Sequence, residues 1–277
     1  MADLYGFDAF SPGEVAHRID AIGVVKARLP LRAMGLLAML AGAFIGLGAA
    51  LSLLVGADAA LPFAARRLAG GVAFSLGLLL VVVAGAELFT GNNLLAMAWA
   101  SGRIGTREVL RNWVVVCAGN FVGASGLALL VWLARTGDLD GGRLGAQALA
   151  LVAAKSALPP TVAFFKGVLC NVLVCMAVWM AAAGRSVVDK AVAIVPPIAA
   201  FVALGFEHSI ANMFFFPFAM LLDPARAGEI GLAMLANLGP VIAGNLVGGS
   251  VLVAGIYWVI YERDRRPPAP PPPPSLP

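Results

Sequence analysis

Long apolar blocks alternate with short polar segments along the chain. Each block is almost free of charge and reaches or exceeds the roughly 20 residues that a helix needs to cross about 30 Å of hydrocarbon. The pattern therefore predicts an all-α integral membrane protein with six transmembrane helices. The six blocks are Ala33–Val55, Ala69–Ala100, Trp113–Ala134, Gln147–Ala183, Ala191–Leu222 and Leu235–Tyr261.

Blocks two and five share a polar cluster where hydrocarbon is expected. Gly85-Ala-Glu-Leu-Phe-Thr-Gly-Asn92 and Gly205-Phe-Glu-His-Ser-Ile-Ala-Asn212 both fit G-x-E-x-x-x-x-N. Blocks three and six share a second pattern, Gly119-Asn-Phe-Val-Gly123 and Gly244-Asn-Leu-Val-Gly248. Close helix packing is the expected role of these paired glycines. Blocks one to three therefore repeat as blocks four to six.

Because three spans is an odd number, the second half must enter the membrane in the opposite orientation. We therefore predict a 3+3 inverted repeat whose second and fifth helices are broken at the polar clusters. In transporters built this way, substrate sites lie at discontinuous helices near the midplane. The alternative is that both clusters only bridge neighbouring helices. Irregular backbone at membrane depth needs protein or a water-filled path to satisfy it.

Four polar residues of the clusters are expected to hold the breaks in shape. Glu87 and Glu207 are intramembrane carboxylates, which are costly unless they are hydrogen-bonded. We expect them to accept hydrogen bonds from the loop amides, a structural role that we favour over proton transfer. Asn92 and Asn212 complete the same pattern.

His208 is the candidate for the transport chemistry. It is one of only two histidines and lies at the presumed midplane, where ionisable residues are usually functional rather than core residues. Burial favours the neutral imidazole, whereas an approaching anion favours the protonated one. Such a group is suited to couple an anion to a proton. Thr90 in the first cluster either lines the path or bonds back to its own turn.

Composition and charge agree with a membrane protein. The chain is 61% hydrophobic and 12% charged, against about 45–50% and about 25% in soluble domains. The formal net charge of +4 is diffuse and does not indicate nucleic-acid binding. We assign the protein to the inner membrane with both termini on the cytoplasmic side. Twelve Lys and Arg residues then lie on the cytoplasmic side and six on the opposite side, as the positive-inside rule favours.

The two ends of the chain differ from the channel domain, residues 33–262. Residues 1–32 contain a predicted amphipathic helix, Ser11–Leu29, at the cytoplasmic membrane surface. Ser11 can act as its N-cap with Glu14 completing a capping box and Pro12 in the first turn. Its shared face is predicted to hold Val15, Ile19, Ile22 and Lys26. Residues 263–277 are rich in proline and are expected to be extended and disordered.

At these residues the sequence resembles the formate/nitrite transporter family of channels. The likeness runs from about Phe7 to Arg263. The stretches that carry it are Ala86-Glu-Leu-Phe-Thr-Gly-Asn92, Phe165-Lys-Gly-Val-Leu-Cys-Asn171-Val-Leu-Val-Cys175, Gly205-Phe-Glu-His-Ser-Ile-Ala-Asn-Met213 and Gly244-Asn-Leu-Val-Gly248.

The resemblance implies an aquaporin-like protomer in a homopentamer, each protomer with its own pore. It also implies hydrogen bonds from Thr90 and Asn171 near His208. Lys155, at the outer edge of block four, would be the positive residue of the outer vestibule; an ordinary loop lysine is the alternative. Two apolar constrictions would flank the histidine, the outer one formed by Phe74 and Phe201 and the inner one by Leu78 and Phe89.

The predicted function is a channel for small monovalent weak-acid anions, most of all formate or nitrite, coupled to a proton through His208. Hydrosulfide, acetate and lactate stay open, because the constriction width decides among them. No cofactor or metal is expected. A membrane-embedded enzyme would need a nucleophile, a metal cluster or a paired acidic motif facing a cavity, and the sequence offers none. An assembly subunit of a respiratory complex is the third possibility.

Overall fold

The computed structural model describes residues 9–263, whose regular secondary structure is helical except for one isolated β-bridge between Ala9 and Gly184. Six helices in it are long and apolar enough to cross a membrane, which confirms the predicted number of spans. These are Leu31–Ala57, Phe63–Gly85, Thr106–Leu133, Pro160–Ala183, Val187–Leu204 and Pro224–Tyr261.

Both predicted helix breaks are present. Helix α3 (Phe63–Leu79) continues as a π-helix to Gly85, and helical structure resumes at Gly91 as a short 3-10 turn followed by α4 (Leu95–Ala100). Helix α8 (Val187–Leu204) stops at Gly205, and α9 (Ser209–Leu222) begins after His208. Gly85 and Gly205 have φ of 88° and 71°, a left-handed conformation that glycine adopts at little cost.

The prediction of block four as a single helix was wrong. The structure divides it into α6 (Leu139–Ser156), whose first turn has left-handed φ at residues 140–142, and α7 (Pro160–Ala183). Pro159 and Pro160 explain the division, because proline lacks an N–H donor and disfavours helix in the residue before it. Among the helices that can cross the membrane, only α7 comes from this block.

Helix α1 (Pro12–Ala27) begins as predicted, with a capping box between Ser11 and Glu14. Its buried face is only partly the predicted one. Val15 and Ile19 are buried, but Ile22 is 40% exposed. The helix packs on α4 and α7. Its placement at the membrane surface stays a prediction, and the proline-rich stretch Pro267–Pro277 lies outside the described residues.

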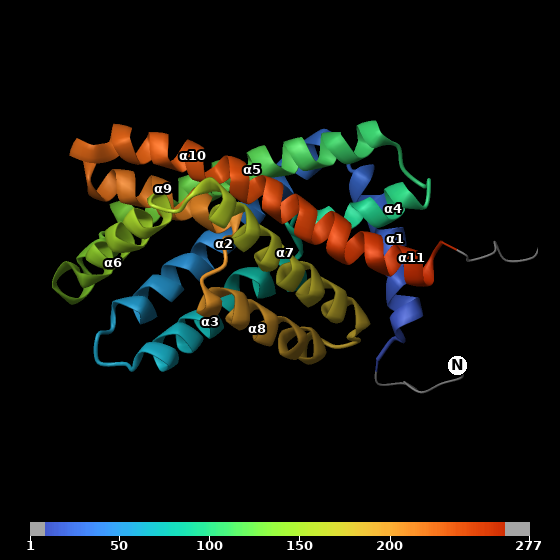
Figure 1. The fold of residues 1–277 in the computed structure, drawn as a ribbon, viewed down its shortest axis with the longest axis horizontal. Helices are drawn as coiled ribbons and strands as arrows, with labels where there is room; N and C mark the ends of the chain where they lie inside the picture. The colour runs from blue at the N-terminus through green and yellow to red at the C-terminus, as the bar shows by residue number, and fades with distance from the viewer. Residues whose placement is uncertain (1–8, 264–277) are drawn as a thin grey trace, which may run out of the picture.

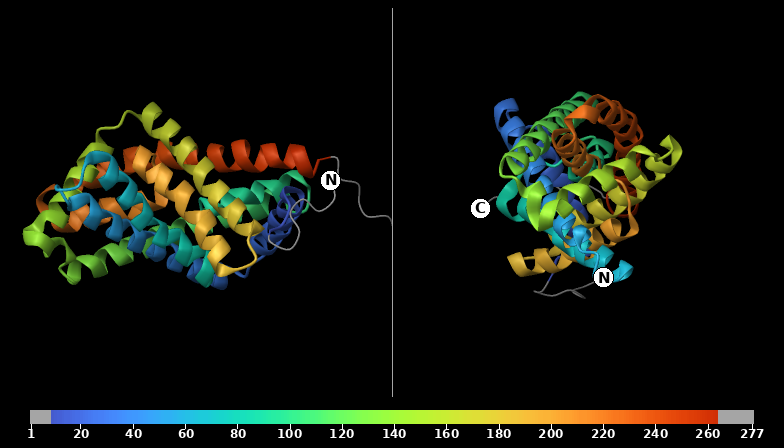
Figure 2. Two further views of the ribbon diagram at one scale, coloured as in Figure 1. Left: turned by 90° about the horizontal axis from the view of Figure 1, so that it is seen from below. Right: turned by 90° about the vertical axis from the view of Figure 1, so that its left-hand side faces the viewer.

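The two halves of the chain make matching contacts, which extends the predicted repeat to the short helices. Helix α2 packs on α3 and α5, and in the second half α7 packs on α8 and α10 in the same way. Helix α1 packs on α4 and α7, and in the second half α6 packs on α9 and α2. Figure 1 shows α3 beside α8, and both figures place α1 and α6 at opposite ends of the elongated bundle (Figures 1 and 2). Helix α6 is thus the counterpart of α1. The inversion and the likeness to aquaporins stay predictions.

The remaining bounds are α2 Leu31–Ala57, α5 Thr106–Leu133, α10 Ala227–Leu246, a π-helix Val247–Gly255 and α11 Ile256–Tyr261.

The paired glycines bring helices into close contact, as predicted. A Cβ atom at Gly123 on α5 would collide with the carbonyl of Met39 on α2. A Cβ atom at Gly248, just after α10, would collide with the carbonyl of Val168 on α7. Only a residue without a side chain lets the backbones approach this closely. These contacts hold α2 and α7 against the elements that position the two breaks.

Candidate functional site

The two helix breaks bring His208 and Thr90 together in the interior. The imidazole Nε2 of His208 lies 3.1 Å from the hydroxyl oxygen of Thr90, and both residues are buried. The other ring nitrogen, Nδ1, accepts a hydrogen bond from the backbone N–H of Ala211 at 3.1 Å, so the side chain caps α9. Because Nδ1 is an acceptor, the neutral imidazole carries its proton on Nε2 and donates it to Thr90. The Thr90 hydroxyl hydrogen then stays available for another acceptor.

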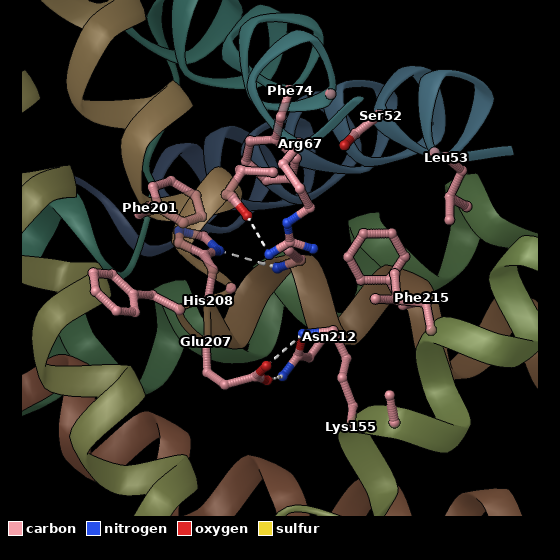
Figure 3. A pocket seen from close by; sticks show the side chains of 18 of the residues that line it. Ser52, Leu53, Arg67, Phe74, Lys155, Phe201, Glu207, His208, Asn212 and Phe215 are labelled. Atoms are coloured by element: carbon pink, nitrogen blue, oxygen red, sulfur yellow. Dashed lines mark hydrogen bonds and ion pairs between the residues drawn. The ribbon is translucent and has the colours of Figure 1, made fainter. Parts of the chain in front are cut away.

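Two phenylalanines form an apolar wall next to the histidine. The ring centroids of Phe74 and Phe201 are 5.5 Å apart in an edge-to-face arrangement. Phe201 also stacks on the imidazole of His208 with centroids 5.8 Å apart, and Figure 3 shows the three rings gathered on one side of the pocket. The two residues assigned to the outer constriction therefore lie together beside His208, and their role as a constriction stays a prediction.

Two cavities lie on either side of this region. The first, of about 440 Å³, is lined by Phe74, Phe201 and His208. The second, of about 630 Å³, is lined by residues of the first break and of α1. Leu78 and Leu88 line the second cavity, whereas Phe89 is buried and lines neither cavity. An inner constriction formed by Leu78 and Phe89 stays a prediction. The repeat carried a signal for Leu88, because it occupies the position of His208 in the first G-x-E-x-x-x-x-N motif.

Glu207 is held by side chains, so the expectation of loop amides as its partners was wrong. Its carboxylate accepts from Lys155 Nζ at 2.8 Å and from Asn212 Nδ2 at 2.7 Å. The same Asn212 amide donates to Asn237 Oδ1 at 2.7 Å. Intramembrane carboxylates need such partners because an unpaired buried charge is costly. This cluster ties α6, the second break and α10 together.

The first half repeats this cluster with equivalent residues. Glu87 accepts from Lys26 Nζ at 2.7 Å and from Asn92 Nδ2 at 2.6 Å, again in place of the expected loop amides. Asn92 Nδ2 also donates to Asn112 Oδ1 at 3.0 Å. Asn92 and Asn212 therefore have the structural place predicted for them. Lys26 and Lys155 were singled out for other roles, and their pairing with the glutamates was not predicted, since α1 and α6 approach the breaks only through the tertiary fold.

A second pair of asparagines fixes the backbone of the breaks. These are the asparagines of the repeated Gly-Asn-x-Val-Gly pattern, in α5 and α10. The Nδ2 of each asparagine donates to the backbone carbonyl of the glutamate in one break. Its Oδ1 accepts a hydrogen bond from the backbone N–H of the residue two positions after that glutamate. Asn120 donates to Glu87 O at 2.9 Å and accepts from Phe89 N at 2.9 Å. Asn245 donates to Glu207 O at 3.0 Å and accepts from Ser209 N at 3.0 Å.

Asn171 lies close to the His208–Thr90 pair, whereas Lys155 has a partner that was not expected. Asn171 donates to the Thr90 carbonyl at 3.2 Å and to Asn93 Oδ1 at 2.7 Å. It therefore supports the backbone of Thr90, with no hydrogen bond to His208 within the described residues. Lys155 lines the first cavity, but its side chain is only 10% exposed and is paired with Glu207. It is therefore a buried ion-pair partner and not a free charge at a vestibule mouth.

Comparisons with known proteins agree on one family. The family model described as formate/nitrite transporter matches residues 13–259. The formate channel FocA of Escherichia coli (strain K12) is 39% identical over 276 residues, which cover 93% of this chain and 96% of FocA. A solved structure described as a pentameric formate channel with formate bound superimposes with a TM-score of 0.77 at 40% identity, covering 83% of this chain and 97% of that one. A structure described as an FNT family ion channel gives 0.79 at 34% identity, with 89% and 98% covered.

Proposed function

The chain belongs to the formate/nitrite transporter family, and on this basis we propose that it is a channel for formate and for similar small weak-acid anions such as nitrite. The observation that carries the proposal is the His208–Thr90 pair between two separate cavities. Phe74 and Phe201 line the cavity on the His208 side, and Leu78 and Leu88 line the other cavity.

The physical problem is to move a charge past these apolar side chains. A bare anion at the centre of a bilayer costs several kcal/mol or more, and protonation of a weak acid removes most of that cost. In the proposed mechanism the anion enters the cavity lined by His208 and takes up there a proton that water supplies from the adjoining bulk solution. It passes the apolar walls as the neutral acid. At this position the Nε2–H of His208 donates to the hydroxyl oxygen of Thr90, and the hydroxyl hydrogen of Thr90 stays available for the permeant.

The carboxylates Glu87 and Glu207 have a supporting role in this mechanism. Each is paired with a lysine and an asparagine, so their charges are compensated before a permeant arrives. Such compensated clusters can hold irregular backbone at membrane depth. We assign the proton-linked step to the cavity beside His208 and leave the glutamates as structural residues.

We further propose that the channel is a homopentamer in the inner membrane with both termini in the cytoplasm. The pentameric formate channel whose structure superimposes on this chain supports the assembly. The two-to-one excess of Lys and Arg on the assigned inner side supports the orientation. The mass of the purified protein in detergent tests the assembly, and labelling of Cys residues introduced in the loops tests the orientation.

Transport by the purified protein in liposomes tests the function directly. We expect liposomes that contain it to swell in ammonium formate, while empty liposomes do not. A panel of formate, nitrite, hydrosulfide, acetate and lactate at several pH values would rank the substrates, with faster proton-linked flux at lower pH. A protein that passes none of these anions would refute the proposal.

A further inference from the structure

Arg67 on α3 lies opposite the end of α8, beside the cavity that His208 lines. The two helices are antiparallel and in close contact one turn away, where a Cβ atom at Gly71 would lie 2.5 Å from the carbonyl oxygen of Ala199. One turn further along, Arg67 Nε donates to the carbonyl of Ala203 at 2.8 Å. The tight glycine contact therefore sets the register that brings the guanidinium to the break.

The last turn of α8 is closed by its own backbone only in part. Gly205 N–H donates to Val202 O at 3.1 Å, and Phe206 N–H donates to Phe201 O at 3.0 Å. This is the bond pattern of a Schellman motif, which leaves other carbonyls of the last turn without a backbone donor. The carbonyl of Ala203 is one of these, and it faces Arg67.

The guanidinium of Arg67 fills this gap with one donor and gives a second donor to a carbonyl that already has a backbone partner. Besides the bond to Ala203, its Nη2 donates to the carbonyl of Val202 at 2.9 Å. A guanidinium has five N–H donors, so three remain, and they have no acceptor within the described residues. Arg67 lines the same cavity as His208, and Figure 3 shows it beside Phe74 and Phe201.

The charge of Arg67 acts at a position where an anion would otherwise be repelled. The carbonyl end of a helix carries a partial negative charge, and α8 ends beside Phe201 and His208. Arg67 compensates this end, whereas the Lys155 ammonium is already paired with Glu207. In the first half, Ala86 N–H closes the equivalent turn on Val81 O at 3.0 Å. There, no side chain of the described residues donates to the next two carbonyls, so the arginine cap is found at one break only.

We propose that Arg67 is the residue that recognises the permeant anion in this cavity, and that it favours planar oxyanions. The inference rests on the proposed function and adds the class of ligand and its binding group. A guanidinium fork can donate two parallel hydrogen bonds to a carboxylate or to nitrite. A hydrosulfide ion, with one heavy atom, cannot accept such a pair. The α8 carbonyls hold the fork in place before the anion arrives.

Formate flux through proteoliposomes, measured against formate concentration, tests this for Arg67→Gln, Arg67→Lys and the neighbouring Arg66→Gln. We expect Arg67→Gln to raise the half-saturating formate concentration on the order of tenfold or more, as befits the loss of charge-assisted hydrogen bonds. When hydrosulfide flux is measured in the same way, Arg67→Lys should raise the half-saturating concentration less for hydrosulfide than for formate. Lysine keeps the charge but loses the guanidinium fork. Arg66 also lines the cavity but makes no bond to α8, so its loss reports diffuse charge alone and should shift the value much less.

Three results would overturn the inference. One is an unchanged half-saturating concentration in Arg67→Gln, and another is an equal shift in Arg66→Gln. In the third, Arg67→Gln has a lower melting temperature, but the formate flux that it retains has an unchanged half-saturating concentration. Arg67 would then only cap α8 and would not recognise the anion. The proposed function fails by a different result, the absence of formate flux in the wild-type protein. In that case the inference is tested by the melting temperature with and without formate. A rise with formate in the wild-type protein that is lost in Arg67→Gln would support the inference, and no rise in the wild-type protein would overturn it.

Discussion

Thr90 and His208 are separated by 118 positions in the sequence, yet Thr90 Oγ1 and His208 Nε2 are 3.1 Å apart. Each residue belongs to a different half of the repeat and to a different helix break. The contact therefore exists only if both breaks form and meet. Its polar atoms are buried, so each depends on the other for its hydrogen bond.

His208→Asn separates the chemistry of the imidazole from its structural role. Asparagine is a good N-cap, so α9 should stay capped at Ala211, but the side chain does not titrate. We expect the variant to assemble normally and to lose the proton-linked part of formate flux. The pH dependence of flux in proteoliposomes is the measurement. Unchanged flux with unchanged pH dependence would remove His208 from the mechanism.

Thr90→Val removes the hydroxyl that His208 Nε2 faces and keeps a similar shape. A buried N–H left without an acceptor costs about 1–3 kcal/mol, so the melting temperature of the purified protein should fall. Formate flux should fall as well, because the imidazole loses its orientation. Thr90→Ser keeps the hydroxyl and serves as the matched control. If valine and serine behave alike, the hydroxyl has no part in positioning His208.

Glu207→Gln should destabilise the protein more than Glu87→Gln does. Both changes leave a lysine without its counter-charge, and removal of one partner from a buried pair costs about 3–5 kcal/mol. Lys155 is 10% exposed whereas Lys26 is 28% exposed, so water can compensate Lys26 better. Melting temperatures of the two variants provide the comparison. The opposite order would show that burial does not set the cost of these pairs.

Gly123→Ala tests the close contact between α5 and α2. The added methyl would meet the Met39 carbonyl, and overpacking of this kind typically costs about 1–3 kcal/mol. Gly126 lies on the same helix with open space where its Cβ would be, so Gly126→Ala should leave the melting temperature unchanged or raise it slightly. Equal effects of the two substitutions would mean that the tight approach does not limit stability.

The sequence predicted the breaks well because their signal is local and occurs twice. Gly85 and Gly205 stand at the start of the same eight-residue pattern, and both adopt the left-handed backbone that glycine permits. The placement of His208 beside Phe201 followed from the family resemblance. The division of block four was missed because composition stays apolar across Pro159 and Pro160, where the backbone cannot continue as one helix.

The partners of the buried polar groups could not be predicted in the same way. Which amine neutralises Glu207 depends on where α6 packs, and nothing in the local sequence around Lys155 states that. The same holds for Arg67, whose acceptors are backbone carbonyls of Val202 and Ala203. A carbonyl is present at every residue, so only the register of α3 on α8 singles these two out.

The N-cap role of His208 limits how it can handle protons. Because Nδ1 is occupied by the amide of Ala211, the imidazole exchanges hydrogen with its surroundings through Nε2 alone. A relay between the two faces of a membrane needs one nitrogen to receive a proton while the other releases it. A histidine with a single free nitrogen cannot do this by itself. Under the proposed mechanism we therefore expect any proton that crosses here to travel on the permeant, and we expect no leak of the proton gradient through this residue.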